Sequence, residues 1–332
     1  MRRASGLSYG RVTRAALPYP LPLAGAPVRV AFVGQRTYFE ACAMPAPAAG
    51  VQPLFIDFRD GAPTAPVLEA LERFDPHAVV LFRPENLPAG TFSGLRAPVV
   101  GFLTEPLPRH GRSSHPDLEY NLAELRRVDR DNVDRVICFD PLGWEAAAEL
   151  LPTWRSMPLP VADDLYRRPT PSRRPPRVVF IGYSTMHRET ALLSLKHEFD
   201  LPHYAHGLMG RELREVLAAS DAGINLHGDR WLVSFENRVL LHLASGHLVI
   251  SEPLDPKYGL DPGLHYVEVG DQYDLDLRVH QLTQQPDAYD RVRIRGHHFS
   301  HQFRASLVWP RVIGDLFADL RAFGTERTVG AA

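Results

Sequence analysis

The chain of 332 residues contains only two cysteines, Cys42 and Cys138, and its charges almost cancel. Two cysteines far apart in sequence do not indicate a disulfide framework or a cysteine-based zinc site. The formal net charge of -2 creates no field that attracts a polyanion, which argues against nucleic acid as a partner. No apolar run approaches the ~20 residues that cross a bilayer. We therefore expect a soluble, cytoplasmic protein without a transmembrane segment.

The composition that remains is ordinary for a globular protein, with 45% hydrophobic and 23% charged residues. The length is about twice that of a usual single domain, which favours two domains. Residues 1–27 begin with two arginines, but prolines interrupt the apolar stretch that follows. This segment is therefore a poor signal peptide, and we interpret it as a flexible N-terminal extension.

Short runs rich in Val, Ile and Phe alternate with amphipathic segments from residue 28 onward, a pattern typical of buried strands between helices. Six strands are predicted in the first half, at residues 28–34, 51–57, 78–82, 99–103, 135–139 and 154–159. Helices are predicted at residues 65–74 and 117–128. Strands that alternate with helices in this way predict a parallel, doubly wound α/β sheet.

A proline-rich stretch at residues 158–176 interrupts this pattern, and the alternation then resumes. The second half has predicted strands at 177–182, 222–226, 247–251 and 265–269, predicted helices at 187–199 and 210–219, and a mostly helical tail at 287–320. We therefore predict two Rossmann-like domains that face each other across a cleft. Their predicted limits are 28–165 and 177–325, with a linker at 166–176.

The turn after the predicted strand 177–182 is a candidate phosphate site, because backbone N–H groups at a helix start can bind an anion. Only Gly182 is present, so the turn lacks the glycine pattern of a dinucleotide fingerprint. Arg188 lies in the first turn of the next helix, where a cation opposes the helix dipole unless an anion is nearby. The alternative is a plain strand-to-helix turn.

Further polar residues follow the next two predicted strands. His227 comes after strand 222–226, at a carboxyl end where open α/β sheets bind ligands, although it could equally be an exposed loop residue. Asn237 and Arg238 open a helix that Gly246 would cap, and they could bind an anion or a sugar hydroxyl. The alternative for this pair is an N-cap beside a surface arginine.

Residues 180–301 resemble the C-terminal half of GT-B glycosyltransferases of the group-1 kind, in particular the CgeB-like branch. The resemblance rests on Asn237-Arg238 and on the run Leu-Ala-Ser-Gly-His-Leu-Val-Ile-Ser-Glu at 243–252. Residues 259–263, Gln285-Pro286 and residues 296–301 also fit. The first half is similar in layout only.

This resemblance implies a GT-B fold and a metal-independent glycosyltransferase of the hexosyltransferase kind. A nucleotide-diphosphate sugar would bind the second domain as co-substrate, and a small-molecule, glycan or protein acceptor would bind the first. Neither a separate cofactor nor a metal is expected. The donor-binding candidates are Gly182, Arg188, His227, Glu236, Asn237, Arg238, Gly246 and Glu252.

The sequence departs from the group-1 pattern at the acids that hold the donor's ribose. Leu241 and Val233 occupy the positions of the usual glutamate and its partner acid. Either Glu236 or Glu252 holds the donor instead, or the chain has lost part of the site. A non-catalytic binding or scaffolding protein and a 2-epimerase of the same fold are therefore alternatives.

An acceptor base is expected at a strand end of the first domain if the reaction inverts the sugar carbon. Glu105 and His110 satisfy this placement, although the same stretch can be a proline-rich surface loop. Gln35, Arg36, Arg83 and Glu85 follow other strands of this domain. The histidines at 297, 298 and 301 lack an adjacent acidic ligand, so we predict no metal site there.

Overall fold

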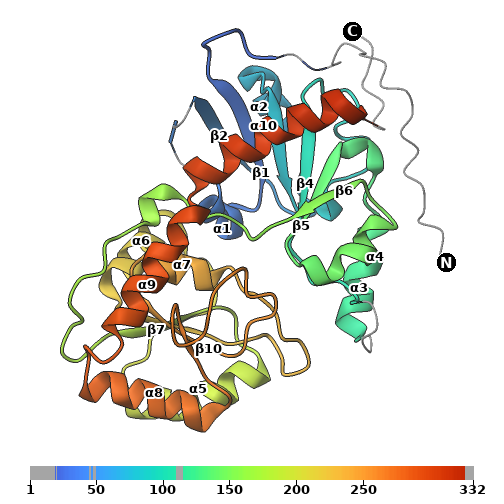
Figure 1. Ribbon diagram of the computed structural model, residues 1–332. Helices are drawn as coiled ribbons and strands as arrows, with labels where there is room; N and C mark the ends of the chain where they lie inside the picture. The colour runs from blue at the N-terminus through green and yellow to red at the C-terminus, as the bar shows by residue number, and fades with distance from the viewer. Residues whose placement is uncertain (1–18, 20, 45, 48–49, 110–114, 326–332) are drawn as a thin grey trace, which may run out of the picture.

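The computed structural model describes residue 19 and residues 21–44, 46–47, 50–109 and 115–325. Two parallel sheets, each flanked by helices, form two α/β domains (Figure 1). Every strand pair within the two sheets is parallel, as the alternating sequence pattern predicts. No helix in the described part of the chain combines the length and apolarity that a membrane crossing requires.

The first sheet has the strand order β2-β1-β3-β4-β5-β6. Its strands are β1 Val28–Gly34, β2 Val51–Asp57, β3 Ala78–Phe82, β4 Val99–Leu103, β5 Arg135–Cys138 and β6 Thr153–Ser156. The first four coincide with the predicted ranges. The predicted continuation of β6 to residue 159 is wrong, because Pro158 lacks the N–H group that a further ladder bond would need.

The second sheet has the strand order β11-β10-β9-β7-β8. Its strands are β7 Val178–Ile181, β8 His203–Tyr204, β9 Ala222–Asn225, β10 Leu248–Ser251 and β11 Val267–Glu268. The sequence did not indicate β8, because two residues are too few to form a recognisable apolar run. β11 is also shorter than the predicted range 265–269.

Helices flank both sheets (Figure 1). The α-helices are α1 Arg36–Phe39, α2 Ala65–Phe74, α3 Pro116–Leu125, α4 Trp144–Ala148, α5 Met186–Glu198, α6 Gly210–Ala219, α7 Arg238–Ala244, α8 Gln272–Gln284, α9 Asp290–Ser300 and α10 Ala305–Phe323. The ranges of α2 and α6 match the predictions. α3 ends three residues before the predicted limit at Val128.

The last helix, α10, crosses back to the first domain and lies against its sheet (Figure 1). The ring of Trp309 is 5.2 Å from that of Phe32 in β1, and Arg135 of β5 pairs with Asp319 at 2.6 Å. The range 177–325 grouped this helix with the second domain. The structure instead packs its apolar stripe on the first sheet, a partner that chain order does not reveal.

The two domains share a packed boundary. One hydrophobic cluster joins Phe39 and Val80 of the first domain to Leu240 of α7 and Trp309 of α10. The proline-rich stretch 158–176 follows this boundary, and its only helical element among the described residues is the 3-10 turn Asp163–Leu165. This packing sets the strand ends of the second sheet at fixed positions relative to the first domain.

Candidate functional site

A pocket of about 360 Å³ lies at the carboxyl ends of the second sheet. Its walls come from the residues that follow β9, β10 and β11 and from the first turns of α5 and α8. The apolar side chains of the lining are Ala191, Leu226, Val233, Pro253, Val269 and Leu275. The polar lining includes His187, His227, Arg230, Glu252, Asp271 and Gln272. An apolar pocket with a few placed polar groups is typical of a small-molecule site.

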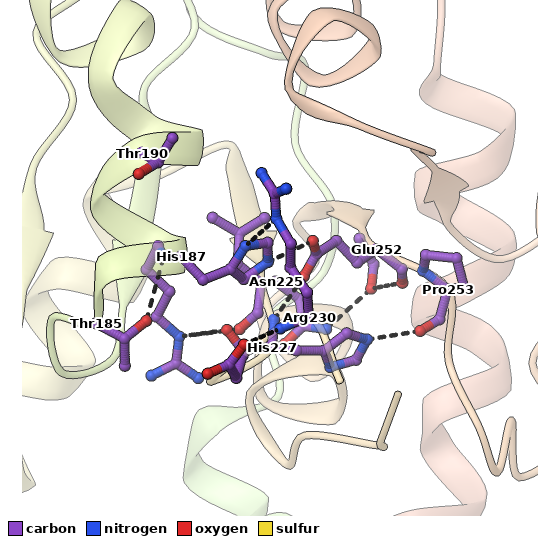
Figure 2. Close-up of polar contacts among 12 residues, drawn as sticks. Thr185, His187, Thr190, Asn225, His227, Arg230, Glu252 and Pro253 are labelled. Carbon is purple, nitrogen blue, oxygen red and sulfur yellow. Dashed lines mark hydrogen bonds and ion pairs between the residues drawn. The ribbon is translucent and has the colours of Figure 1, made fainter. Parts of the chain in front are cut away.

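Glu252 is the most firmly held acid of this pocket. One carboxylate oxygen is 2.7 Å from Nε2 of His187, and the other accepts a 2.7 Å hydrogen bond from the backbone N–H of His227. The His227 ring lies 2.7 Å from the carbonyl oxygen of Pro253, so its Nε2 atom carries the proton (Figure 2). His227 is therefore a buried residue of the pocket wall rather than an exposed loop residue.

Arg188 lies beside this pocket and is only 1% exposed. Its Nε atom donates to the carbonyl oxygens of Leu226 and His227 at 3.1 and 3.0 Å, and its Nη1 atom donates to that of Tyr183 at 3.1 Å. Burial, followed by the charge of Arg238, lowers the pKa of Arg188 to about 10. The guanidinium therefore ties the strand exits of β7 and β9 together.

Arg238 and Arg188 converge on one carboxylate, that of Glu236. Arg238 donates through Nη2 to one oxygen of Glu236 at 3.0 Å, and Arg188 through Nη2 to the other at 3.4 Å. Arg238 also donates to the carbonyl oxygen of Leu226 at 2.9 Å. Two guanidinium groups at the carboxyl ends of parallel strands form an anion site, and here Glu236 supplies the anion.

Gly182 gives Arg238 the space that it occupies. A Cβ atom at position 182 would lie 3.2 Å from both Cζ and Nη2 of Arg238. The sequence analysis places this glycine in a candidate phosphate-binding turn. Its contact with Arg238 places it in the arginine site through a close approach of backbone and side chain.

Two of the candidate donor-binding residues, Asn237 and Gly246, have their contacts elsewhere in the molecule. Asn237 contacts the first domain, where its Nδ2 atom is 3.1 Å from Sγ of Cys42, and its side chain does not cap α7. Gly246 follows α7 with φ 76°, and a Cβ there would lie 2.8 Å from the carbonyl oxygen of Arg167. Gly246 is thus the predicted helix cap, and it faces the linker.

In the first domain, Arg83 joins two acids that follow neighbouring strands. Arg83 has left-handed backbone with φ 56° and lies 2.9 Å from Glu85 and 3.4 Å from Glu105. The Glu85 side chain is 7% exposed, and burial raises its pKa although Arg83 opposes that shift. Glu105 is 40% exposed. His110 lies outside the described residues.

Several other polar residues considered in the sequence analysis lie elsewhere in the molecule and contact other residues. Arg36 pairs with Glu40 and lines a second pocket, of about 370 Å³, between β2, α1, residues 162–165 and α6. His297 and His301 contact each other at 3.1 Å through their Nε2 atoms. Among the residues that the structure describes, no group of three or more His, Cys, Asp or Glu side chains could hold a metal ion.

Sequence reasoning missed part of the pocket. His187, Arg230, Asp271 and Gln272 line it but were not among the candidates. Asp271 and Gln272 follow β11, whose end at Glu268 lies within one residue of the predicted end, so applying the rule that ligands bind beyond strand ends to this strand would have found them. Val233 lines the pocket, whereas Leu241 is 9% exposed within α7.

Comparison with known proteins finds similar folds among solved structures. No family model matches the chain, and no curated protein does. The complex of Anabaena HepE with UDP-glucose matches with a TM-score of 0.55 and 12% identity, over 88% of this chain and 100% of that one. The chain has the GT-B fold.

Two further GT-B neighbours agree with this assignment. Sucrose-phosphate synthase from Thermosynechococcus elongatus has a TM-score of 0.51 at 11% identity, over 89% of this chain and 90% of that one. The β-glucosyltransferase of phage T4 has a TM-score of 0.50 at 10% identity, over 87% and 99%. The fold class predicted from the sequence is confirmed, and identities this low establish the GT-B fold alone.

Proposed function

We propose that this GT-B protein transfers a sugar from a nucleoside-diphosphate donor to a nucleophile on an acceptor. The finer assignment, also part of the proposal, is a metal-independent hexosyltransferase of the CgeB-like branch that acts in the cytoplasm. The neighbours support the donor class, because HepE binds UDP and UDP-glucose in its solved complexes. UDP and UDP-glucose are therefore the first probes.

The observation that carries the proposal is the position of the two arginines next to the 360 Å³ pocket. Leu226 links the two features, since it lines the pocket and its carbonyl oxygen accepts from both Arg188 and Arg238. A nucleoside in the pocket would direct its phosphates toward these guanidinium groups. Arginine is suited to this role because its planar group binds phosphate oxygens in pairs.

In the proposed reaction, the bond between the sugar carbon and the diphosphate oxygen breaks, and the acceptor nucleophile forms a new bond to that carbon. The leaving diphosphate gains negative charge, which Arg188 and Arg238 stabilise without a metal. The acceptor loses a proton, and we assign its removal to Glu105 because this carboxylate is exposed at a strand end of the first domain.

Glu252 is proposed to hold the donor's ribose. Its carboxylate is 17% exposed on the pocket wall and is oriented by His187 and the backbone of His227. The positions of the group-1 acids cannot do so, since Val233 is apolar and Leu241 is buried within α7. This loss also supports a second candidate, a non-catalytic GT-B protein that binds a partner.

Replacing Arg238 with Ala tests the proposal. We expect UDP affinity to fall at least about tenfold, since a charge-assisted hydrogen bond contributes about 1.5–3 kcal/mol. Titration calorimetry with UDP measures this, and donor hydrolysis or transfer is followed over a panel of nucleotide sugars. Arg155→Ala is the matched control, because Arg155 pairs with Asp315 of α10 away from the pocket. Absence of UDP binding and of turnover in the unaltered protein would favour the non-catalytic candidate.

A further inference from the structure

We propose that Glu236 is an internal counter-ion that the donor's diphosphate must displace, and that returns to the arginines when the nucleoside diphosphate leaves. This inference rests on the proposed function and concerns the regulation of the same site. It reassigns Glu236, which the sequence placed among the donor-binding residues, to a competitor of the donor.

Glu236 already occupies the position between Arg188 and Arg238 that a phosphate would take. Its two oxygens bind different arginines, Arg188 at 3.4 Å and Arg238 at 3.0 Å. A phosphate group offers oxygens to two guanidinium groups in the same way. The Glu236 carboxylate and a phosphate would therefore compete for the same two Nη2 atoms, and only one of them can bind these atoms at a time.

Nε and Nη1 of Arg188 and Nη1 of Arg238 are bound to the backbone. The two Arg188 atoms bind three carbonyl oxygens, and the Arg238 atom binds that of Leu226. These bonds fix the guanidinium groups whether or not a ligand is bound. The Nη2 atoms, which contact Glu236, are the ones that exchange partners when an anion enters.

The side chain of Glu236 is partly exposed and can rotate away, whereas its backbone is held in place by the neighbouring residues. Its side chain is 26% exposed, whereas that of Arg188 is 1% exposed. The chain neighbours of Glu236 are anchored on the first domain, because Phe235 packs 6.0 Å from Phe139 and Asn237 contacts Cys42. Glu236 therefore leaves by rotation of its side chain, and it can return without rearrangement of the loop.

The consequence concerns product release. A carboxylate that competes for the arginines lowers the affinity for free nucleoside diphosphate as well as for the donor. The nucleoside itself is unaffected, since Glu236 does not line the pocket. An effect confined to the phosphates separates this proposal from a role of Glu236 in binding the donor.

The test compares Glu236→Gln with the unaltered protein by calorimetry, using UDP, inorganic pyrophosphate and uridine as separate probes. We expect UDP and pyrophosphate to bind the variant at least about fivefold more tightly, which is the lower end of typical coupling between linked ligands, and uridine to bind equally. Inhibition of transfer by UDP should increase in parallel. Asp315→Asn, the same chemical change in the remote pair with Arg155, should alter none of these affinities.

Equal or weaker UDP binding by the variant would overturn the proposal, and so would a matching gain in uridine affinity. If the unaltered protein binds neither UDP nor any other nucleoside diphosphate of the nucleotide-sugar panel, the proposed function itself fails. Should Glu236→Gln not fold, a crystal structure of the unaltered protein with UDP decides the matter. The proposal requires Glu236 to have left both guanidinium groups there, and a carboxylate still bridging Arg188 and Arg238 would refute it.

Discussion

The residues beyond the strands of the second sheet are bound mainly to backbone, whereas those beyond the first sheet bind mainly to one another. Arg188 and Arg238 both donate to carbonyl oxygens, and Glu252 accepts from a backbone N–H. Arg83, in contrast, pairs with the side chains of Glu85 and Glu105. Backbone anchors hold a side chain in one place, while pairs of side chains can adjust together.

Exposure follows the same division. Arg188 is 1% exposed, whereas Glu105 is 40% exposed. The comparison teaches that the proposed donor site is formed before any ligand binds, while the proposed acceptor side is open. A pre-formed site holds charge where the leaving group will need it, and an open site admits acceptors of several shapes.

The largest expected effect comes from Glu105→Gln, which separates the two sides. Loss of the proposed base should lower the transfer rate by roughly a hundredfold to ten-thousandfold, with UDP affinity unchanged. Steady-state kinetics and calorimetry on the same preparation measure the two quantities. Asp75→Asn, which alters an exposed carboxylate paired with Arg29, is the control. A fall in UDP affinity equal to the fall in rate would show that the two sides are not independent.

The next effect concerns the dependence of folding stability on pH. Buried groups of the two domains should contribute to this dependence with opposite signs. In the second domain, His242 and His247 are buried with their Nδ1 atoms 3.0 Å apart. Burial lowers both pKa values, that of His247 from 6.5 to about 4. Below about pH 6.5 the unfolded chain binds more protons than the folded one, so stability falls as the pH falls. The loss for His247 between about pH 6.5 and about pH 5 is on the order of 2 kcal/mol.

Glu85 of the first domain acts in the opposite direction. Burial raises the pKa of its carboxyl, so the folded state holds the proton more firmly and this contribution is lost as the pH rises. Thermal unfolding of the unaltered protein, of Glu85→Gln and of His247→Gln across this pH range measures both contributions. Glu85→Gln should raise Tm near neutral pH, and His247→Gln should reduce the loss in acid. An acid loss in His247→Gln as large as that of the unaltered protein would contradict the histidine assignment.

The smallest expected effect is that of Gly182→Ala within the second domain. The new Cβ would lie 3.2 Å from Cζ of Arg238, so the guanidinium must shift by a few tenths of an ångström. We expect UDP affinity to fall about threefold, because misplacement of a charged group weakens its hydrogen bonds. Tm should also fall, because Gly182 has φ 159° and a Cβ there would lie 3.2 Å from Cζ of Phe180. Gly228→Ala is the control, since its nearest atom would be the Tyr183 hydroxyl at 3.8 Å. Equal affinities in the two variants would show that Gly182 does not position Arg238.

The sequence predicted the site best where one local force dominates. Arg188 in the first turn of α5 opposes the helix dipole, which suggested a phosphate nearby, and the structure pairs it with the Glu236 carboxylate. Asn237 and Gly246 were less well predicted as site residues, because polarity and glycine geometry suit a domain contact or a helix cap equally well. Their surroundings depend on Cys42 and Arg167, which lie far away in the chain.

By itself, the sequence determined the two wound domains, since the periodic spacing of apolar residues identifies buried strands and amphipathic helices. Strands β1 to β4 and helices α2 and α6 could be delimited residue by residue for this reason. Only the tertiary structure decided that α10 covers the first sheet, and that Glu236 bridges two arginines. Both depend on contacts between residues whose sequence separation carries no periodic signal, so packing alone selects the partner.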